Sequence, residues 1–167
     1  GGHRWRYRGA GTRQHLPNHV DLAPTSLGLA RLPVPAAMQG VDYSPVVRGE
    51  APPRPLPSEA YLGAVVPTGH GDSMDEPWRG IVTMDGWKYV AVEGQPLMLH
   101  DLARDPYEQI NLAHAAHARE RRRELNALLA AWIARTGDDF ALPVLDGDGF
   151  AASSLAARRR FPLPPSN

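Results

Sequence analysis

The hydrophobic pattern is most regular between residues 79 and 92, where two short apolar runs flank a turn. Residues 87–92 read Trp-Lys-Tyr-Val-Ala-Val, so alternate side chains belong to opposite faces of a strand. Asp85-Gly86 precedes this run and is typical of a type I′ turn, because that turn needs positive φ at both central residues. The pattern predicts a β-hairpin made of residues 79–84 and 87–92.

Two further runs extend the predicted hairpin into a sheet. Residues 59–65 (Glu-Ala-Tyr-Leu-Gly-Ala-Val) and residues 97–102 (Leu-Met-Leu-His-Asp-Leu) are short and apolar, and Gly, Pro and Asp residues flank them. We therefore expect a small antiparallel sheet of about four strands.

A helical pattern follows the predicted sheet. Five apolar residues have the spacing i, i+3, i+4, i+7, i+8 of one helical face: Leu125, Leu128, Leu129, Trp132 and Ile133. Asn111 is a candidate cap for the start of this helix, and Gly137 is expected to end it. The charged run 119–124 is expected to be a solvated face of the helix. The predicted fold class is α+β, a small antiparallel sheet packed by a C-terminal amphipathic helix.

The remaining segments are less regular. A short helix is expected near residues 21–32, with Asp21 at its start, Pro24 in its first turn, and prolines after it. Residues 36–58 are rich in proline and are expected to form a connector. The last part, 138–167, is expected to be a weakly ordered tail. The alternation of Arg with Trp5 and Tyr7 near the start favours an edge strand over a nucleic-acid-binding segment.

Composition limits the classes of partner. The chain has 167 residues with 18 basic and 18 acidic side chains, so its formal net charge is zero. A balanced charge gives no electrostatic reason to expect nucleic acid or an anionic membrane as a partner. No apolar run approaches the roughly 20 residues of a membrane helix. The absence of cysteine excludes disulfides, thiolate metal sites and a cysteine nucleophile in this sequence.

Residue chemistry alone reveals no catalytic constellation. His114 and His117 lie three residues apart, but no third metal ligand is assigned to them, and an exposed helix face is the favoured interpretation. His70 lies in a polar loop, residues 66–77, with nearby carboxylates that are common on ordinary loops. The sequence contains no phosphate-binding Gly-Lys-Ser/Thr and no Gly-x-Ser-x-Gly elbow. The sequence therefore offers no nucleophile from its motifs.

The order of several short segments carries more information than any one of them. These segments are HVDLAPT (19–25), MQG (38–40), WRGIVTMDGWKY (78–89), LMLHDLARDPYEQINL (97–112) and WIARTGD (132–138). Together they resemble the C-terminal part of a sulfatase, an arylsulfatase-like member of the alkaline phosphatase superfamily. The resemblance runs from about residue 16 to 138. It departs from the family at His100, where Tyr is usual, and at Val82, where a second Arg is usual.

The resemblance implies a division of the chain. Residues 1–35 correspond to the end of the catalytic-domain region, 36–58 to a connector, and 59–137 to a C-terminal subdomain with a four-stranded sheet and a long helix. In sulfatases the nucleophile is a formylglycine made from a C/S-x-P-S/T-R motif, and N-terminal carboxylates and amides hold a calcium ion. This sequence contains no such motif. We therefore expect formylglycine and calcium in a catalytic N-terminal half that acts as the partner of this chain, and no cofactor in the chain itself.

The resemblance also implies a function. The parent protein would hydrolyse a sulfate ester, and this chain would support the fold and the rim of the substrate pocket while being inactive alone. His70, Trp78, Arg79 and His100 are the rim candidates, with side-chain packing as the simpler interpretation of Trp78 and a strand-edge charge as that of Arg79. Two alternatives stay open: part of a related phosphodiesterase or phosphonate hydrolase, and a non-catalytic stand-alone binding module. Family members are often periplasmic, secreted or lysosomal, and the sequence leaves the compartment open, the cytoplasm included.

Overall fold

The structure is a computed structural model, and it describes residues 16–51, 56–64 and 76–145. The predicted edge strand near the start, His70 and most of the predicted tail lie outside these residues. The chain divides into two compact units, unit 1 (Gly1–Ala60) and unit 2 (Tyr61–Asn167). Each unit is described by itself.

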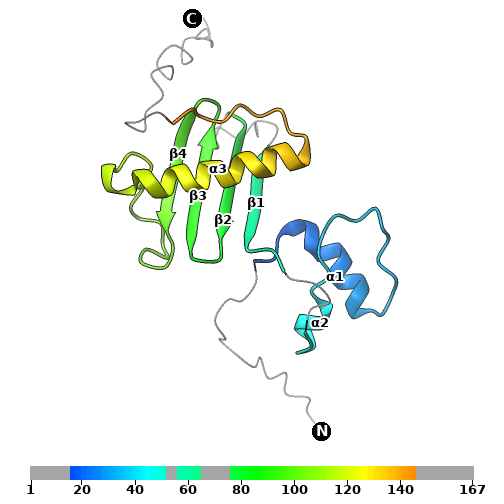
Figure 1. Cartoon of the computed structure of the whole chain (residues 1–167). Helices are drawn as coiled ribbons and strands as arrows, with labels where there is room; N and C mark the ends of the chain where they lie inside the picture. Colours follow the sequence, from blue (N-terminus) through cyan, green and yellow to red (C-terminus); the bar gives the residue numbers. More distant parts are fainter. Residues whose placement is uncertain (1–15, 52–55, 65–75, 146–167) are drawn as a thin grey trace, which may run out of the picture. The chain divides into compact units, whose positions relative to one another are not determined.

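Unit 2 is built on an antiparallel sheet, as predicted. Its strands are β1 (Glu59–Ala64), which begins two residues before the boundary of the unit, β2 (Trp78–Thr83), β3 (Trp87–Val92) and β4 (Gln95–Asp101). They lie in the order β1-β2-β3-β4, so each strand pairs with its neighbours in sequence (Figure 1). The predicted fold class, α+β with a four-stranded sheet under a C-terminal helix, is confirmed.

The hairpin between β2 and β3 forms where the pattern predicts it, but its turn differs. Gly86 has φ +88°, whereas Asp85 is not among the described residues with positive φ. The N–H of Gly86 donates to the Thr83 carbonyl oxygen at 3.0 Å, which closes a turn around Met84 and Asp85. The type I′ prediction is therefore wrong, because the loop has three residues and needs positive φ only at its last position.

Helix α3 (Arg119–Thr136) follows a short 3-10 turn, η2 (Ala116–Ala118), and runs across one face of the sheet (Figure 1). Its buried residues are Arg122, Leu125, Leu129 and Ile133, whereas Leu128 is 39% exposed. Gly137 ends the helix in the left-handed conformation, as predicted. The prediction that Asn111 caps this helix is wrong, since the residue before Arg119 is Ala118 and no side chain caps it.

The core of unit 2 lies between α3 and this face of the sheet. Its buried strand residues include Ile81, Tyr89, Ala91 and Leu99, which confirms that Tyr89 and Ala91 share a face. Residues 138–145 also belong to this layer, because Phe140 and Leu142 pack against the core. The sequence pattern ends the subdomain at 137, and the structure adds the segment that runs back beside α3 (Figure 1).

Unit 1 contains short helices and few buried residues. Its elements are η1 (His19–Asp21), α1 (Leu22–Leu29) and α2 (Ser44–Val47). Pro24 lies in the first turn of α1, as predicted, and is buried. α2 lies inside the segment expected to be a plain connector. Pro45 occupies one of its first positions, where the missing N–H of proline is not needed.

Candidate functional site

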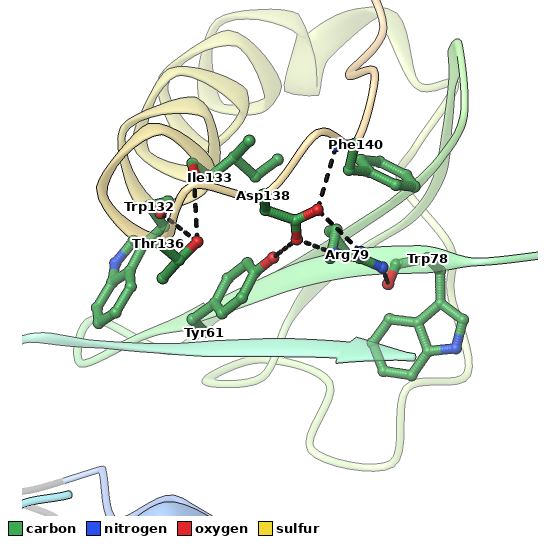
Figure 2. A network of polar contacts seen from close by, with 8 residues as sticks. All are labelled: Tyr61, Trp78, Arg79, Trp132, Ile133, Thr136, Asp138 and Phe140. Carbon is green, nitrogen blue, oxygen red and sulfur yellow. Dashed lines mark hydrogen bonds and ion pairs between the residues drawn. The ribbon is translucent and has the colours of Figure 1, made fainter. Parts of the chain in front are cut away.

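Arg79, Tyr61 and Asp138 form a partly buried polar network in unit 2 (Figure 2). Arg79 Nε donates to Asp138 Oδ2 at 2.5 Å, and Arg79 Nη2 donates to Asp138 Oδ1 at 3.0 Å. The Tyr61 hydroxyl donates to the same carboxylate at 2.7 Å. Since only 5% of the Arg79 side chain is exposed, the ion pair is shielded from water.

Aromatic rings enclose this network on two sides. The Arg79 guanidinium lies 4.8 Å from the centre of the Phe140 ring, and the Tyr61 ring stacks on Trp132 with 5.7 Å between ring centres. The hydrogen bond from Arg79 lowers the pKa of Asp138 to about 2. Burial raises the pKa of Tyr61 to about 12, and the hydrogen bond to Asp138 adds to this effect. The network is thus a charged anchor that binds the segment after α3 to strands β1 and β2.

The three rim candidates that the structure describes, Trp78, Arg79 and His100, do not gather in one place. Arg79 pairs with Ala91 across the sheet, so it lies on the face covered by α3. Trp78 and His100 lie on the opposite face, because their strand partners are Val92 and Lys88, alternate residues of β3. Figure 2 shows the Trp78 ring on the side of β2 away from Asp138. His70 lies outside the described residues.

Trp78 and His100 are also separated along their shared face. Their partners Val92 and Lys88 are four residues apart on β3, a spacing of about 13 Å. His100 is 5% exposed, and its Nδ1 has no hydrogen-bond partner within the described part of the chain. Trp78 is partly exposed. A ligand on this face could therefore contact Trp78 directly, whereas the side chains around His100 cover it.

The motif residues of unit 2 bind one another. Lys88 Nζ lies 2.7 Å from Glu108 Oε2, which joins β3 to the loop after β4. Glu108 has φ +55°, a backbone conformation that residues other than glycine rarely adopt. The ion pair with Lys88 therefore helps to hold a strained residue in place. Asn111 accepts hydrogen bonds from the N–H groups of Leu99 and Ala113 and donates to the Leu97 carbonyl oxygen. Asn111 therefore binds this loop along β4 instead of capping a helix.

The motif residues of unit 1 make the same kind of contact. Asp21 is buried, and its Oδ1 accepts a hydrogen bond from the Val41 N–H at 2.7 Å. Thr25 Oγ1 accepts one from the Tyr43 N–H at 3.0 Å. A Cβ atom on Gly40 would lie 2.0 Å from the Val20 carbonyl oxygen, so glycine is required at this close approach. The motif at residues 19–25 and the motif at residues 38–40 thus pack against each other.

The sequence pattern missed two residues of unit 2. Asp138 was expected in the tail, yet it forms the ion pair with Arg79. The feature of the sequence that could have indicated this role is its position directly after Gly137, the residue that ends the helix. Arg122 was expected on a solvated face, yet it is 1% exposed and donates to the Ala113 carbonyl oxygen at 2.7 Å. Burial lowers the pKa of Arg122, and the positive charge of Arg119 acts in the same direction. Arg122 lies three residues before Leu125, on the buried face of α3, where an apolar residue would be expected.

Neither a metal centre nor a membrane span is found in the described segments. No group of three or more His, Cys, Asp or Glu side chains is placed there to hold a metal ion. The sulfatase resemblance puts the expected calcium site in the catalytic N-terminal half and not among these residues. No helix in this part of the protein is both long and apolar enough to cross a membrane.

This chain is similar to known proteins over part of their length. No family model matches the sequence. The chain is 31% identical over 123 residues to an ulvan-active sulfatase of Formosa agariphila, a match that covers 74% of this chain and 23% of that protein. It is 33% identical over 132 residues to a delta 4,5-hexuronate-2-O-sulfatase of Bacteroides thetaiotaomicron, with 77% and 26% covered. This chain belongs to the sulfatase family.

The relationship to sulfatases is partial in length. The chain spans about a quarter of the length of the curated relatives it matches. A solved structure of a 2-O GAG sulfatase superposes with a TM-score of 0.59 at 27% identity, covering 77% of this chain and 30% of that one. The predicted resemblance to sulfatases is confirmed. Side chains of the sulfatase motifs form hydrogen bonds and ion pairs between segments of this chain.

Proposed function

We propose that this chain is the C-terminal part of a sulfuric ester hydrolase, in which it supports the fold and shapes the substrate rim. The catalytic N-terminal half supplies the formylglycine and the calcium ion. The chain alone does not hydrolyse sulfate esters. The chain thus contributes structure, and residues of the catalytic N-terminal half carry out the reaction.

One observation carries the proposal. The polar side chains of the sulfatase motifs are engaged with other segments of the same chain, as Asp21 with Val41, Arg79 with Asp138, and Lys88 with Glu108. A side chain held in this way fixes the position of the segment that it binds. The contacts of the motif residues therefore support a structural role for this chain.

The substrate class follows from the relatives. Their names describe sulfatases that act on ulvan and on a delta 4,5-hexuronate with a 2-O-sulfate. We propose a sulfated saccharide as the substrate, which favours a sulfate ester over the phosphodiester or phosphonate alternative. Trp78 is the rim candidate best suited to a sugar, because it is partly exposed and a ring face packs against apolar sugar surface.

His100 is the second rim candidate that we retain, as a residue that supports the rim from beneath. It is almost fully buried, so it meets a substrate only through the side chains above it. Arg79 supports the rim in another way, since its guanidinium is bound to Asp138 on the opposite face. His70 is retained from its sequence position alone.

A fusion protein tests this proposal. The full 167-residue chain would replace the matching region of the Bacteroides sulfatase, with the formylglycine motif of that enzyme retained. We expect the fusion to hydrolyse a 2-O-sulfated unsaturated uronide, and Trp78→Ala to raise KM with little change in kcat. A soluble, folded fusion without turnover would contradict the proposal and favour a stand-alone binding module.

A further inference from the structure

The loop after β4 is held in place by the side chain of every third residue from Asp105 to Asn111. Asp105 Oδ2 accepts a hydrogen bond from the Ile110 N–H at 2.8 Å, which closes the loop on itself. Glu108 Oε2 lies 2.7 Å from Lys88 Nζ and thereby binds the loop to β3. Asn111 forms hydrogen bonds with two backbone groups of β4. The backbone of this loop is therefore fixed against the sheet.

Three other side chains of the loop, each one position before a residue that holds it, lie in solvent. The side chain of Arg104 is 91% exposed, and Tyr107 and Ile110 are 83% and 64% exposed. They share the spacing of three residues, so they project away from the groups that hold the loop. A loop that is already fixed loses little conformational freedom when its exposed side chains bind a ligand.

The charges of the loop favour an anionic ligand. Its two acidic side chains are engaged, Asp105 with a backbone N–H and Glu108 with Lys88. The guanidinium of Arg104 has a carboxylate of Asp101 at 3.6 Å, a weak contact for so exposed an arginine, so its N–H groups can bind another acceptor. The loop thus presents an accessible cation beside an exposed aromatic ring.

We propose that a sulfated saccharide chain binds the strip formed by Arg104, Tyr107 and Ile110. The apolar face of a sugar packs on the Tyr107 ring, and Ile110 extends this apolar contact. The Arg104 guanidinium donates hydrogen bonds to the oxygens of a sulfate group, as it does to other oxyanions. The inference rests on the proposed function for the class of saccharide, and it adds the residues that bind the saccharide chain.

The strip lies at the end of the sheet opposite Trp78. Glu108 connects the loop to Lys88, whereas Trp78 pairs with Val92, four residues further along β3. A sugar that contacts Trp78 is therefore not the sugar that contacts the strip. The strip adds affinity for a saccharide chain of several sugars, and a single sugar gains nothing from both contacts.

Affinity electrophoresis of the full 167-residue chain in gels that contain ulvan tests the proposal. We expect ulvan to retard the chain, and Tyr107→Ala and Arg104→Ala each to weaken binding at least about threefold. Tyr107→Phe keeps the ring and should bind within about twofold of the parent chain. Arg135→Ala is the matched control, because it removes the same charge from another exposed arginine of unit 2. The substituted side chains are exposed, so Tm should not change.

Several results would overturn the proposal. These are no retardation by ulvan, equal retardation by desulfated ulvan, or an equal loss of binding in Arg135→Ala. A concentration-dependent dimer that Tyr107→Ala abolishes would also overturn it, because the strip would then contact a second copy of the chain. Binding is measured without turnover, so the two proposals fail separately. If the variants lose ulvan binding while the fusion protein has no sulfatase activity, the strip stands and the proposed function fails.

Discussion

Replacing Asp138 with Asn should lower the free energy of unfolding of unit 2 by about 2.5 kcal/mol at pH 7. Asn has the shape of a protonated Asp, so the substitution removes the charge that Arg79 stabilises. The pKa of Asp138 is lowered from its ordinary value of 3.8 to about 2, and this shift corresponds to about 2.5 kcal/mol. Removing one partner of a fully buried pair costs about 3–5 kcal/mol, and the 16% exposure of Asp138 places it below that range.

Urea unfolding followed by tryptophan fluorescence measures this loss, because Trp78, Trp87 and Trp132 all lie in unit 2. Asp139→Asn is the matched control, since Asp139 is an exposed carboxylate one residue away. We expect the control to change the free energy of unfolding by less than about 0.5 kcal/mol. The comparison separates loss of the ion pair from loss of a negative charge after the helix.

The pH dependence gives a second signature with a defined sign. A carboxyl group whose pKa is lowered in the folded state stabilises the fold above its unfolded pKa, and this stabilisation is lost as pH falls through the folded pKa. The difference between wild type and Asp138→Asn should therefore shrink from about 2.5 kcal/mol at pH 7 to about 1.3 kcal/mol at pH 3. A difference below about 1 kcal/mol at pH 7, or one that stays constant down to pH 3, would refute the reasoning.

Three further substitutions test other contacts. Tyr61→Phe keeps the ring stack on Trp132 but removes the hydrogen bond to Asp138, so calorimetry should show a loss of about 1.5 kcal/mol; no loss would mean that the bond does not stabilise the fold. Asn111→Ala removes three hydrogen bonds to backbone groups and should cost about 2–3 kcal/mol in urea unfolding, whereas an effect below about 0.5 kcal/mol would argue against its role beside β4. Gly40→Ala places a Cβ 2.0 Å from the Val20 carbonyl oxygen, so the Val41 N–H should lose at least about tenfold of its hydrogen-exchange protection; unchanged exchange would contradict the close approach.

The elements of unit 2 are predictable because local patterns dominate there. The residues of β3 alternate between two faces, and Gly137 marks the helix end without reference to any distant residue. The turn at Gly86 was mispredicted because a dipeptide does not fix loop length, which depends on the register of Val82 with Lys88. Similarly, Asn111 is a good cap by composition, but β4 offers its side chain three backbone partners.

The polar network around Arg79 could not be predicted from sequence. Its two other members, Tyr61 and Asp138, are 77 residues apart, and no periodicity relates them. Burial of Arg122 was equally hidden, because a charged run with this composition is usually solvated and only the packed helix shows which member faces the sheet. The sulfatase motifs identified the family from order and spacing, whereas the contacts of those motifs required the structure.

The central claim is that this chain supports the fold of a sulfatase and does not itself catalyse hydrolysis of the sulfate ester. Its most direct test is the hydrolysis of an aryl sulfate by the purified 167-residue chain, assayed with and without calcium beside an active sulfatase as reference. We predict no release of product above the rate without protein in either condition. Sustained turnover that copurifies with the chain would contradict the account, since it would require a nucleophile within the residues of this sequence.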